Sequence, residues 1–205
     1  MIPQSPLLVG LCGNAGVGKD TFAEQFHYYG FKQYSFAGPV KKVCEAAFSI
    51  SPDYFTDRQL KEEEHPFWEI SPRVMAQKVG TELFRNHFGQ DFWIRRLELQ
   101  LILDFDSKQD VKAVITDVRF QNEAEWILDS GGILVHLTRP GYVGNVGIPG
   151  HASEAGIDFD SLEYTYPEDR FYQIYNQGSK AELLQLSADL LDSIAPKQHR
   201  QLTFP

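Results

Sequence analysis

Short hydrophobic runs alternate along the chain with longer segments in which hydrophobic residues recur at helical spacing. Five runs have the length and composition of buried strands, at about residues 7–12, 34–36, 111–116, 133–137 and 171–175. Helical patterns lie between and after them, at about residues 19–29, 39–48, 72–88, 91–103, 120–128 and 179–195. Alternating strands and helices predict an α/β fold in which crossover helices pack on a five-stranded parallel sheet.

Two regions depart from this alternation. Residues 49–65 lose the periodic pattern and end in Lys61-Glu62-Glu63-Glu64, a charged run that is typical of a solvated surface. Residues 139–166 are rich in Gly and Pro, which predicts a long functional loop or lid. We therefore expect one domain of 205 residues, made of a core at 1–48 and 107–205, a helical region at about 49–106 and a lid at about 139–166.

Composition narrows the class of protein. Hydrophobic residues make up 42% of the chain, enough for a buried core, and the net charge is −9, which argues against non-specific nucleic-acid binding. Cys12 and Cys44 have neither a metal-ligand spacing nor a disulfide pattern. The sequence shows no signal peptide and no run long enough to span a membrane, so we expect a cytoplasmic protein with no membrane partner.

The strongest local signal is a glycine-rich turn between the first strand and the first helix. Glycines let backbone N–H groups approach a bound polyphosphate, the helix N-terminus adds its dipole, and Lys19 adds a mobile cation. We expect ATP phosphates to bind at Gly13, Asn14, Ala15, Gly16, Val17, Gly18, Lys19, Asp20 and Thr21. No G-x-G-x-x-G register fits these glycines, which disfavours a dinucleotide-binding fold.

One position differs from the general P-loop pattern. Asp20 stands directly after the lysine, where a Ser or Thr hydroxyl usually meets Mg²⁺, and Thr21 comes next. Asp20 could attract Mg²⁺ through water while Thr21 binds a phosphate oxygen. In this respect the turn resembles nucleoside monophosphate kinases more than GTPases or motor ATPases.

If the chain is a kinase, it needs cations outside the glycine-rich turn as well, because a second anionic substrate must bind beside ATP. Lys41 and Lys42 follow the second strand, at the sheet edge where ligands bind, although two solvated lysines are an equal alternative. In the next helix a polar stripe recurs every four residues, opposite the apolar Val74, Val79 and Leu83; its members are Arg73, Gln77, Thr81 and Arg85. Such a stripe suits a monophosphate and its base, although a solvent-facing stripe fits the pattern nearly as well.

Further candidates stand at the ends of later strands. Asp117 ends the third strand, where a carboxylate can orient Mg²⁺ or accept from a sugar hydroxyl, and Arg119 follows two residues later. Arg139 ends the fourth strand and could stabilise charge on the transferred phosphoryl group. His151 and Glu154 are candidate lid residues that meet the acceptor.

Taken in order, these motifs resemble the phage-type deoxynucleoside monophosphate kinases. The segments that carry the resemblance are the residue 13–21 turn, Phe36-Ala37 with Lys41, the stripe from Arg73 to Arg85 with Gly80-Thr81-Glu82, Asp91-x-Trp93-Ile94, Thr116 to Ala124, His151-x-Ser153-Glu154 and Asn176-x-Gly178-Ser179. They span the chain from the first strand to the last helix.

The resemblance implies a P-loop NTPase three-layer sandwich with a five-stranded parallel sheet, an NMP-binding helical region and a lid. It implies ATP- and Mg²⁺-dependent phosphorylation of a deoxynucleoside 5′-monophosphate, and family members are often homodimers. By this analogy Lys19 stabilises the transferring group, the acceptor is held by Lys41, Arg73, Gln77 and Arg119, and Asn176 to Ser179 lie near the adenine. The lid carries Arg139 as its obvious arginine, unlike the arginine-rich lids of adenylate kinases.

Two other functions fit parts of the sequence. A kinase for another small metabolite on the same fold would not need the stripe from Arg73 to Arg85. A nucleotide-binding regulatory module would bind ATP without acceptor-stimulated turnover. A nucleic-acid enzyme is disfavoured by the acidic charge.

Overall fold

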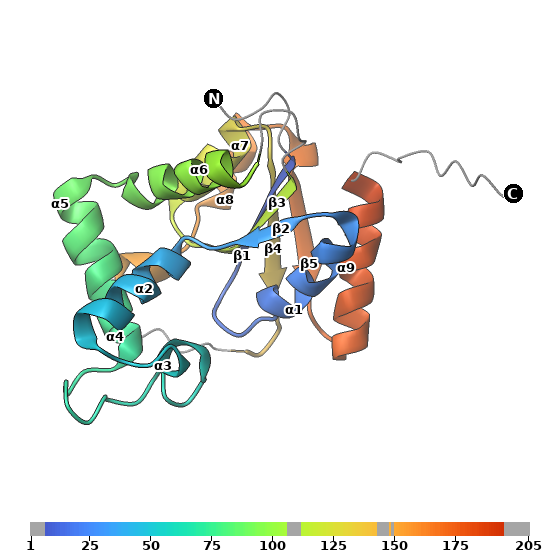
Figure 1. Ribbon diagram of the computed structural model, residues 1–205. Helices are drawn as coiled ribbons and strands as arrows, with labels where there is room; N and C mark the ends of the chain where they lie inside the picture. The colour runs from blue at the N-terminus through green and yellow to red at the C-terminus, as the bar shows by residue number, and fades with distance from the viewer. Residues whose placement is uncertain (1–6, 106–111, 143–147, 149, 195–205) are drawn as a thin grey trace, which may run out of the picture.

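The computed structural model describes residues 7–105, 112–142, 148 and 150–194, apart from the side chain of Glu154. At its centre lies a parallel sheet of five strands in the order β2-β3-β1-β4-β5 (Figure 1). The strands are β1 Leu7–Cys12, β2 Lys32–Tyr34, β3 Lys112–Val118, β4 Ile133–Thr138 and β5 Phe171–Tyr175. The predicted five-stranded parallel sheet is confirmed.

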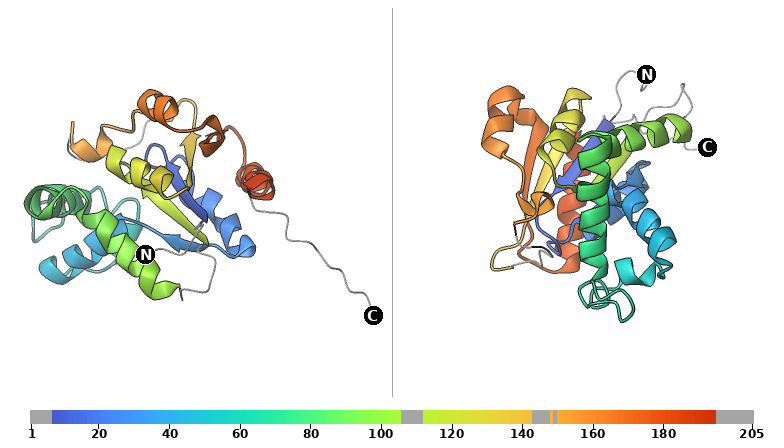
Figure 2. Two further views of the ribbon diagram at one scale, coloured as in Figure 1. Left: turned by 90° about the horizontal axis from the view of Figure 1, so that it is seen from above. Right: turned by 90° about the vertical axis from the view of Figure 1, so that its left-hand side faces the viewer.

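Helices cover both faces of the sheet (Figures 1 and 2). Val9 and Leu11 of β1 pack with residues of helices α1, Lys19–Ala23, and α9, Lys180–Ile194, on one face. Leu8 and Cys12, which alternate with them along the strand, pack into a second cluster on the other face. That second cluster includes residues of α2 Ala37–Phe48, α6 Phe92–Asp104, α7 Gln121–Asp129 and α8 Phe159–Thr165, together with residues of the helical region described next. Two helical layers around one sheet make the three-layer sandwich.

The helical region lies between α2 and α6. It contains α3, Asp53–Thr56, and a continuous helix over residues 72–88 that begins with Pro72 at its first position and Ser71 as its cap, whose side chain accepts from Val74 N. That helix is α-helical in α4, Pro72–Gln77, widens to π-helical hydrogen bonding in η2, Lys78–Arg85, and ends in α5, Asn86–Phe88. The wider turns of η2 are common at functional sites.

Helix boundaries elsewhere follow local hydrogen bonds. The helix predicted over residues 19–29 is α-helical only to Ala23 and continues as the 3-10 segment η1, Glu24–Tyr29. The last helix has the expected capping box, because Ser179 N donates to Glu182 Oε2 and Glu182 N donates to Ser179 Oγ.

Two expectations need correction. Strand β2 ends at Tyr34 because the next backbone N–H groups turn into α2 and bind Asp117. Residues 139–166 are not all loop. They contain η3, Ala152–Glu154, and helix α8, in which Leu162 is buried and the N-cap Asp158 accepts from Ser161 N with its side chain. After this region a further 3-10 turn, η4 Glu168–Arg170, precedes β5.

Among the described residues, no helix combines the length and the apolar character needed to cross a bilayer.

Candidate active site

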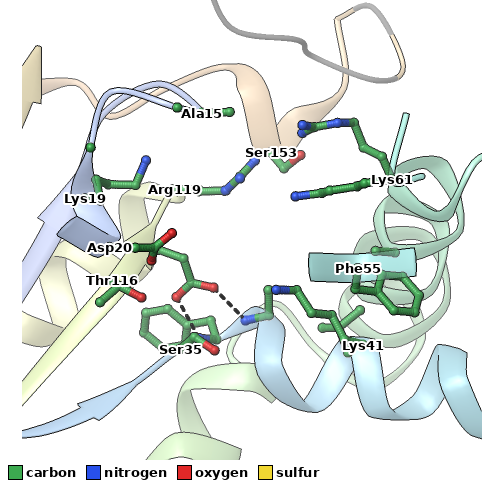
Figure 3. Close-up of a pocket in the computed structure, with 18 of the residues that line it drawn as sticks. Ala15, Lys19, Asp20, Ser35, Lys41, Phe55, Lys61, Thr116, Arg119 and Ser153 are labelled. Carbon is green, nitrogen blue, oxygen red and sulfur yellow. Dashed lines mark hydrogen bonds between the residues drawn. The ribbon is translucent and has the colours of Figure 1, made fainter. Parts of the chain in front are cut away.

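A cavity of about 870 Å³ opens at the carboxyl end of the sheet. Its walls come from the glycine-rich turn, the β2–α2 connection, the helical region, the end of β3 and the segments around Ser153 and Asn176 (Figure 3). In parallel α/β folds ligands bind at this edge. The cavity therefore brings together segments from both ends of the described chain, from Ala15 to Leu183.

The glycine-rich turn needs glycine at the positions that approach other backbone or the lid. Gly13, Gly16 and Gly18 have φ angles of 125°, 82° and 106°, which side chains rarely adopt. A Cβ on Gly13 would lie 2.1 Å from Leu137 O, and one on Gly16 would lie 2.2 Å from the Tyr142 hydroxyl. The turn therefore keeps its backbone close to β4 and to the first residues of the lid.

Lys19 is buried at the base of this turn. Its ammonium donates to Gly13 O at 2.6 Å and to Asn14 O at 2.9 Å. Burial, and next the nearby charge of Arg119, lowers the pKa of Lys19 from 10.5 to about 8. A buried cation whose hydrogen bonds, among the described residues, go to two neutral carbonyls is ready to exchange them for an anion.

The remaining residues of the turn divide between the cavity and the core. Ala15, Asp20 and Thr21 line the cavity, whereas Val17 is buried. The buried Asn176 donates from Nδ2 to Val17 O at 2.8 Å, so it braces the turn. Asn176, Gly178 and Ser179 also line the cavity.

Positive side chains face one another across the cavity. The predicted Lys41, Arg73 and Arg119 all line it. Two cations that sequence reasoning did not identify, Arg58 and Lys61, join them from the helical region. Lys42, next to Lys41, is exposed and lies outside the lining. Of the two alternatives for these lysines, a position at the ligand site therefore applies to Lys41 and a solvated position to Lys42.

The polar stripe of the helix over residues 72–88 faces inward. Arg73, Gln77 and Arg85 are buried, Thr81 also lines the cavity, and Leu83, expected on the apolar face, is 47% exposed. The alternative of a solvent-facing stripe is therefore wrong. The i→i+5 hydrogen bonding of η2 keeps residues four apart on nearly the same face.

Arg73 has a partner that the sequence did not indicate. Its Nε lies 2.8 and 2.9 Å from the two carboxylate oxygens of Glu62, its Nη2 donates to Glu62 Oε1 at 2.5 Å, and its backbone N–H donates to Lys61 O at 3.1 Å. The run at residues 61–64 is thus not wholly a solvated surface, since its first two members shape the cavity. This contact fixes the orientation of the guanidinium through Nε and Nη2, so Nη1 takes no part in the pairing with Glu62.

Arg85 also lines the cavity, but its charge is satisfied inside the protein. It forms a salt bridge with Glu123, both side chains being 2% exposed, and its guanidinium stacks 3.8 Å over the Phe120 ring. Its Nη1 donates to Gln90 O at 2.7 Å. Burial raises the pKa of Glu123, while Arg85 opposes that change. These contacts favour a framework role for Arg85 over the direct acceptor contact that the sequence suggested.

Asp117 stands at the cavity edge of β3 with both carboxylate oxygens engaged. They accept from the backbone N–H groups of Phe36 and Ala37 at 2.8 Å each. These bonds fix the start of α2 and with it Lys41 (Figure 3). The carboxylate of Asp20, which is exposed beside the glycine-rich turn, has no such backbone contacts among the hydrogen bonds of the described residues.

The expected lid contacts the helical region through Gln77. Gln77 Oε1 accepts from Ile148 N at 3.0 Å, and its Nε2 lies 3.5 Å from Ser153 Oγ. Ser153 lines the cavity, and the buried His151 accepts from Ser153 N at Nδ1. Arg139 reaches the cavity with its guanidinium 5.7 Å from the Tyr142 ring centre. The side chain of Glu154 lies outside the described residues.

A parallel sheet with a glycine-rich turn, a buried lysine and a ring of cations over one cavity defines a P-loop kinase. The family model described as deoxynucleotide monophosphate kinase matches residues 50–183, from the helical region to the start of α9. The chain belongs to this family. Because the match begins after the glycine-rich turn, the phosphate-binding geometry is independent support for the same class.

Individual relatives agree with this assignment. The chain is 36% identical over 152 residues to the "Putative deoxynucleotide monophosphate kinase" of Acanthamoeba polyphaga mimivirus, covering 66% of this chain and 75% of that protein. It is 29% identical to the deoxynucleoside-5′-monophosphate kinase of Escherichia phage T5, covering 74% and 85%. The solved structure of TT1252 from Thermus thermophilus shares the fold, with a TM-score of 0.51 at 16% identity over 94% of this chain and 100% of that one.

Proposed function

We propose that the protein transfers the γ-phosphoryl group of ATP to the 5′-phosphate of a deoxynucleoside monophosphate, with Mg²⁺ as the metal. Family membership supports the reaction class. The observation that carries the proposal is the set of cations around one cavity, Lys19 on the side of the glycine-rich turn and Lys41, Lys61, Arg73 and Arg119 around the space beside it. Two phosphate groups need such neutralisation to approach each other.

Each part of the chain has a proposed task. The turn at residues 13–21 binds the phosphates of ATP, and Lys19 stabilises the group in transfer. Lys41, Arg73 and Arg119 bind the acceptor phosphate, and Gln77 and Thr81 lie where the nucleoside can bind. The segments at 49–106 and 139–166 act as the acceptor-binding region and the lid, with Arg139 supplying a cation from the lid.

The residues around the turn fit a nucleotide-bound Mg²⁺. This ion usually takes one or two carboxylates together with phosphates and waters, and Asp20 offers an exposed carboxylate beside the phosphate-binding backbone. When bound, Mg²⁺ would neutralise charge on the phosphates. Asp117 acts mainly by positioning, because both its oxygens already accept backbone N–H groups.

The chemistry then follows from positioning and charge. The acceptor phosphate is largely ionised at neutral pH, so in-line attack needs no strong general base. Contacts between Gln77 and the segment at Ile148 and Ser153 join the lid to the acceptor side. Closure there would exclude water and limit ATP hydrolysis.

We test the proposal by measuring ADP release from ATP and Mg²⁺ with each deoxynucleoside and ribonucleoside monophosphate in turn. We expect one or a few deoxynucleotides to raise the rate at least ~100-fold over the acceptor-free reaction, because correct positioning supplies most of the acceleration. A flat panel with ATP still bound would contradict the proposal. It would then favour a metabolite kinase or a nucleotide-binding regulatory module.

Nucleotide binding should weaken above pH 8. The free-state pKa of Lys19 is about 8, lowered from 10.5 first by burial, so below pH 8 its ammonium is already charged. A bound phosphate favours the ammonium and raises that pKa, so above pH 8 binding must be accompanied by proton uptake. We expect the Kd for ADP, measured by calorimetry, to be level from pH 6.8 to 7.5 and to rise up to ~10-fold per pH unit above 8.

The variant Lys19→Arg is the control for this pH dependence. A guanidinium stays charged throughout the range, so its affinity, though lower, should vary much less between pH 7 and 9.5. An equally steep rise of Kd in Lys19→Arg would show that another group titrates.

A further inference from the structure

Lys61 belongs to a charged run that predicts a solvated surface, yet it lines the cavity. It lies between α3 and α4, and its carbonyl accepts from Arg73 N at 3.1 Å, which fixes its backbone to the start of α4. The side chain extends into the cavity toward the side that carries Lys19 and Arg119 (Figure 3). Its neighbours Glu63 and Glu64 are exposed.

The surroundings of Lys61 disfavour its positive charge. Burial lowers the pKa of Lys61 from 10.5 to about 8, and the charges of Arg73, Lys41 and Arg119 act in the same direction. Glu62 opposes them, but its carboxylate is engaged in the bidentate contact with Arg73. In the described part of the chain, no hydrogen bond from the Lys61 ammonium is found. A half-buried lysine among three cations is stabilised when an anion enters.

We propose that Lys61 is a further substrate-binding residue, and that its ammonium binds the phosphate of the acceptor. This inference rests on the proposed function and adds a residue to its acceptor site. Lys61 shares its neighbourhood with Arg73, Lys41 and Arg119, the cations proposed to bind that phosphate, so one phosphate can contact several of them.

The position of Lys61 also accounts for a feature of the lid. Residues 139–166 contain one arginine, Arg139, and no lysine. Charge on the reacting phosphates must therefore be neutralised largely from elsewhere. Lys61 supplies a cation from the helical region, on a segment that Glu62 ties to Arg73. Lys61 and Glu62 thus both contribute to binding one phosphate: Lys61 contacts it directly, and Glu62 orients Arg73.

The kinetic test compares Lys61→Met with Lys61→Arg and with the matched control Lys42→Met. Lys42 is an exposed lysine outside the cavity lining. In Lys61→Met we expect KM for the deoxynucleoside monophosphate to rise ~10- to 100-fold, the usual effect of losing a hydrogen bond to a charged group. KM for ATP and the midpoint of thermal unfolding should change little. Lys61→Arg should recover most of the loss.

Several results would overturn the inference while the wild-type enzyme still phosphorylates its acceptor. One is an acceptor KM in Lys61→Met within twofold of wild type. Another is an equal rise in KM for ATP, or a loss that Lys61→Arg does not reduce. A wild-type protein without acceptor-dependent turnover would instead contradict the proposed function.

A binding measurement tests the role of Lys61 even if the wild-type protein shows no acceptor-dependent turnover. Inorganic pyrophosphate is titrated by calorimetry into protein saturated with ADP, so that the phosphate sites of the glycine-rich turn are already occupied. We expect the Kd for pyrophosphate to rise at least ~5-fold in Lys61→Met and to be unchanged in Lys42→Met, because Lys61 lines the cavity and Lys42 does not. Equal affinity in the two variants would show that Lys61 binds no phosphate.

Discussion

Replacing Lys19 by Met should lower kcat by ~10²- to 10³-fold while leaving the fold intact. The ammonium is buried within the glycine-rich turn, and its hydrogen bonds in the described part of the chain go to Gly13 O and Asn14 O. Charge that develops on the phosphoryl group during transfer would lose its nearest fixed cation, and the loss of one such group commonly costs ~10²- to 10³-fold. Methionine preserves the length of the side chain but not its charge.

The same variant should unfold at an unchanged or slightly higher temperature. Burial lowers the pKa of Lys19 to about 8, so the folded protein disfavours the ammonium relative to water. Removing a charge that the fold disfavours should not destabilise it. Loss of activity without loss of stability therefore separates a catalytic role from a structural one.

Steady-state kinetics and thermal unfolding of Lys19→Met check both expectations. Lys78→Met is a matched control, since Lys78 is an exposed lysine of η2 outside the cavity lining, and its kcat should stay within twofold of wild type. A kcat for Lys19→Met within tenfold of wild type would contradict the role proposed for Lys19.

The sequence was most informative where local pattern decides the structure. The strand at residues 7–12 is a short apolar run followed by Gly13, and its neighbours in the sheet, β3 and β4, are likewise short, largely apolar runs. The turn at residues 13–21 could be located because its glycines are needed by backbone geometry, as the φ angles of Gly13, Gly16 and Gly18 show. Such signals need no knowledge of distant contacts.

The sequence was least informative where a side chain's role depends on a distant partner. Lys61 and Glu62 belong to a charged run typical of a surface, but in the fold Lys61 lines the cavity and Glu62 contacts Arg73 of α4. The i, i+4 spacing that selected Arg73 and Arg85 could not show that Glu62 orients the first and Glu123 neutralises the second. Helix α8 did carry a local signal, the Asp158 cap with Leu162, but Gly and Pro before it indicated a loop.

Breaking the Arg85–Glu123 pair should have the largest effect on stability. Both side chains are 2% exposed, and Glu123 also accepts from the backbone N–H groups of Arg119 and Phe120 at 2.9 and 3.1 Å. Arg85→Met would leave Glu123 buried without its counter-charge, and such single removals commonly cost ~3–5 kcal/mol. For a chain of this size we expect the midpoint of thermal unfolding to fall by roughly 6–20 °C.

The double variant Arg85→Met with Glu123→Met distinguishes an unpaired charge from a packing defect. Removing both charges should restore much of the stability lost in Arg85→Met, because replacing a whole buried ion pair by apolar groups is often close to neutral. The Lys180–Glu24 pair, at 2.9 Å with side chains 63% and 48% exposed, is the control, and Lys180→Met should cost less than ~1 kcal/mol.

These measurements also decide between two roles for Arg85. If Arg85 mainly supports the framework, Arg85→Met will lose stability with or without substrate, and the acceptor KM measured at low temperature will change little. If Arg85 mainly binds the acceptor, as the stripe alone suggested, the KM will rise sharply and the unfolding midpoint will stay near that of the wild type. The burial of both partners and the stacking of Arg85 on Phe120 favour the framework role. A loss below ~1 kcal/mol in Arg85→Met would contradict it, because a buried carboxylate cannot lose its counter-charge at so small a cost.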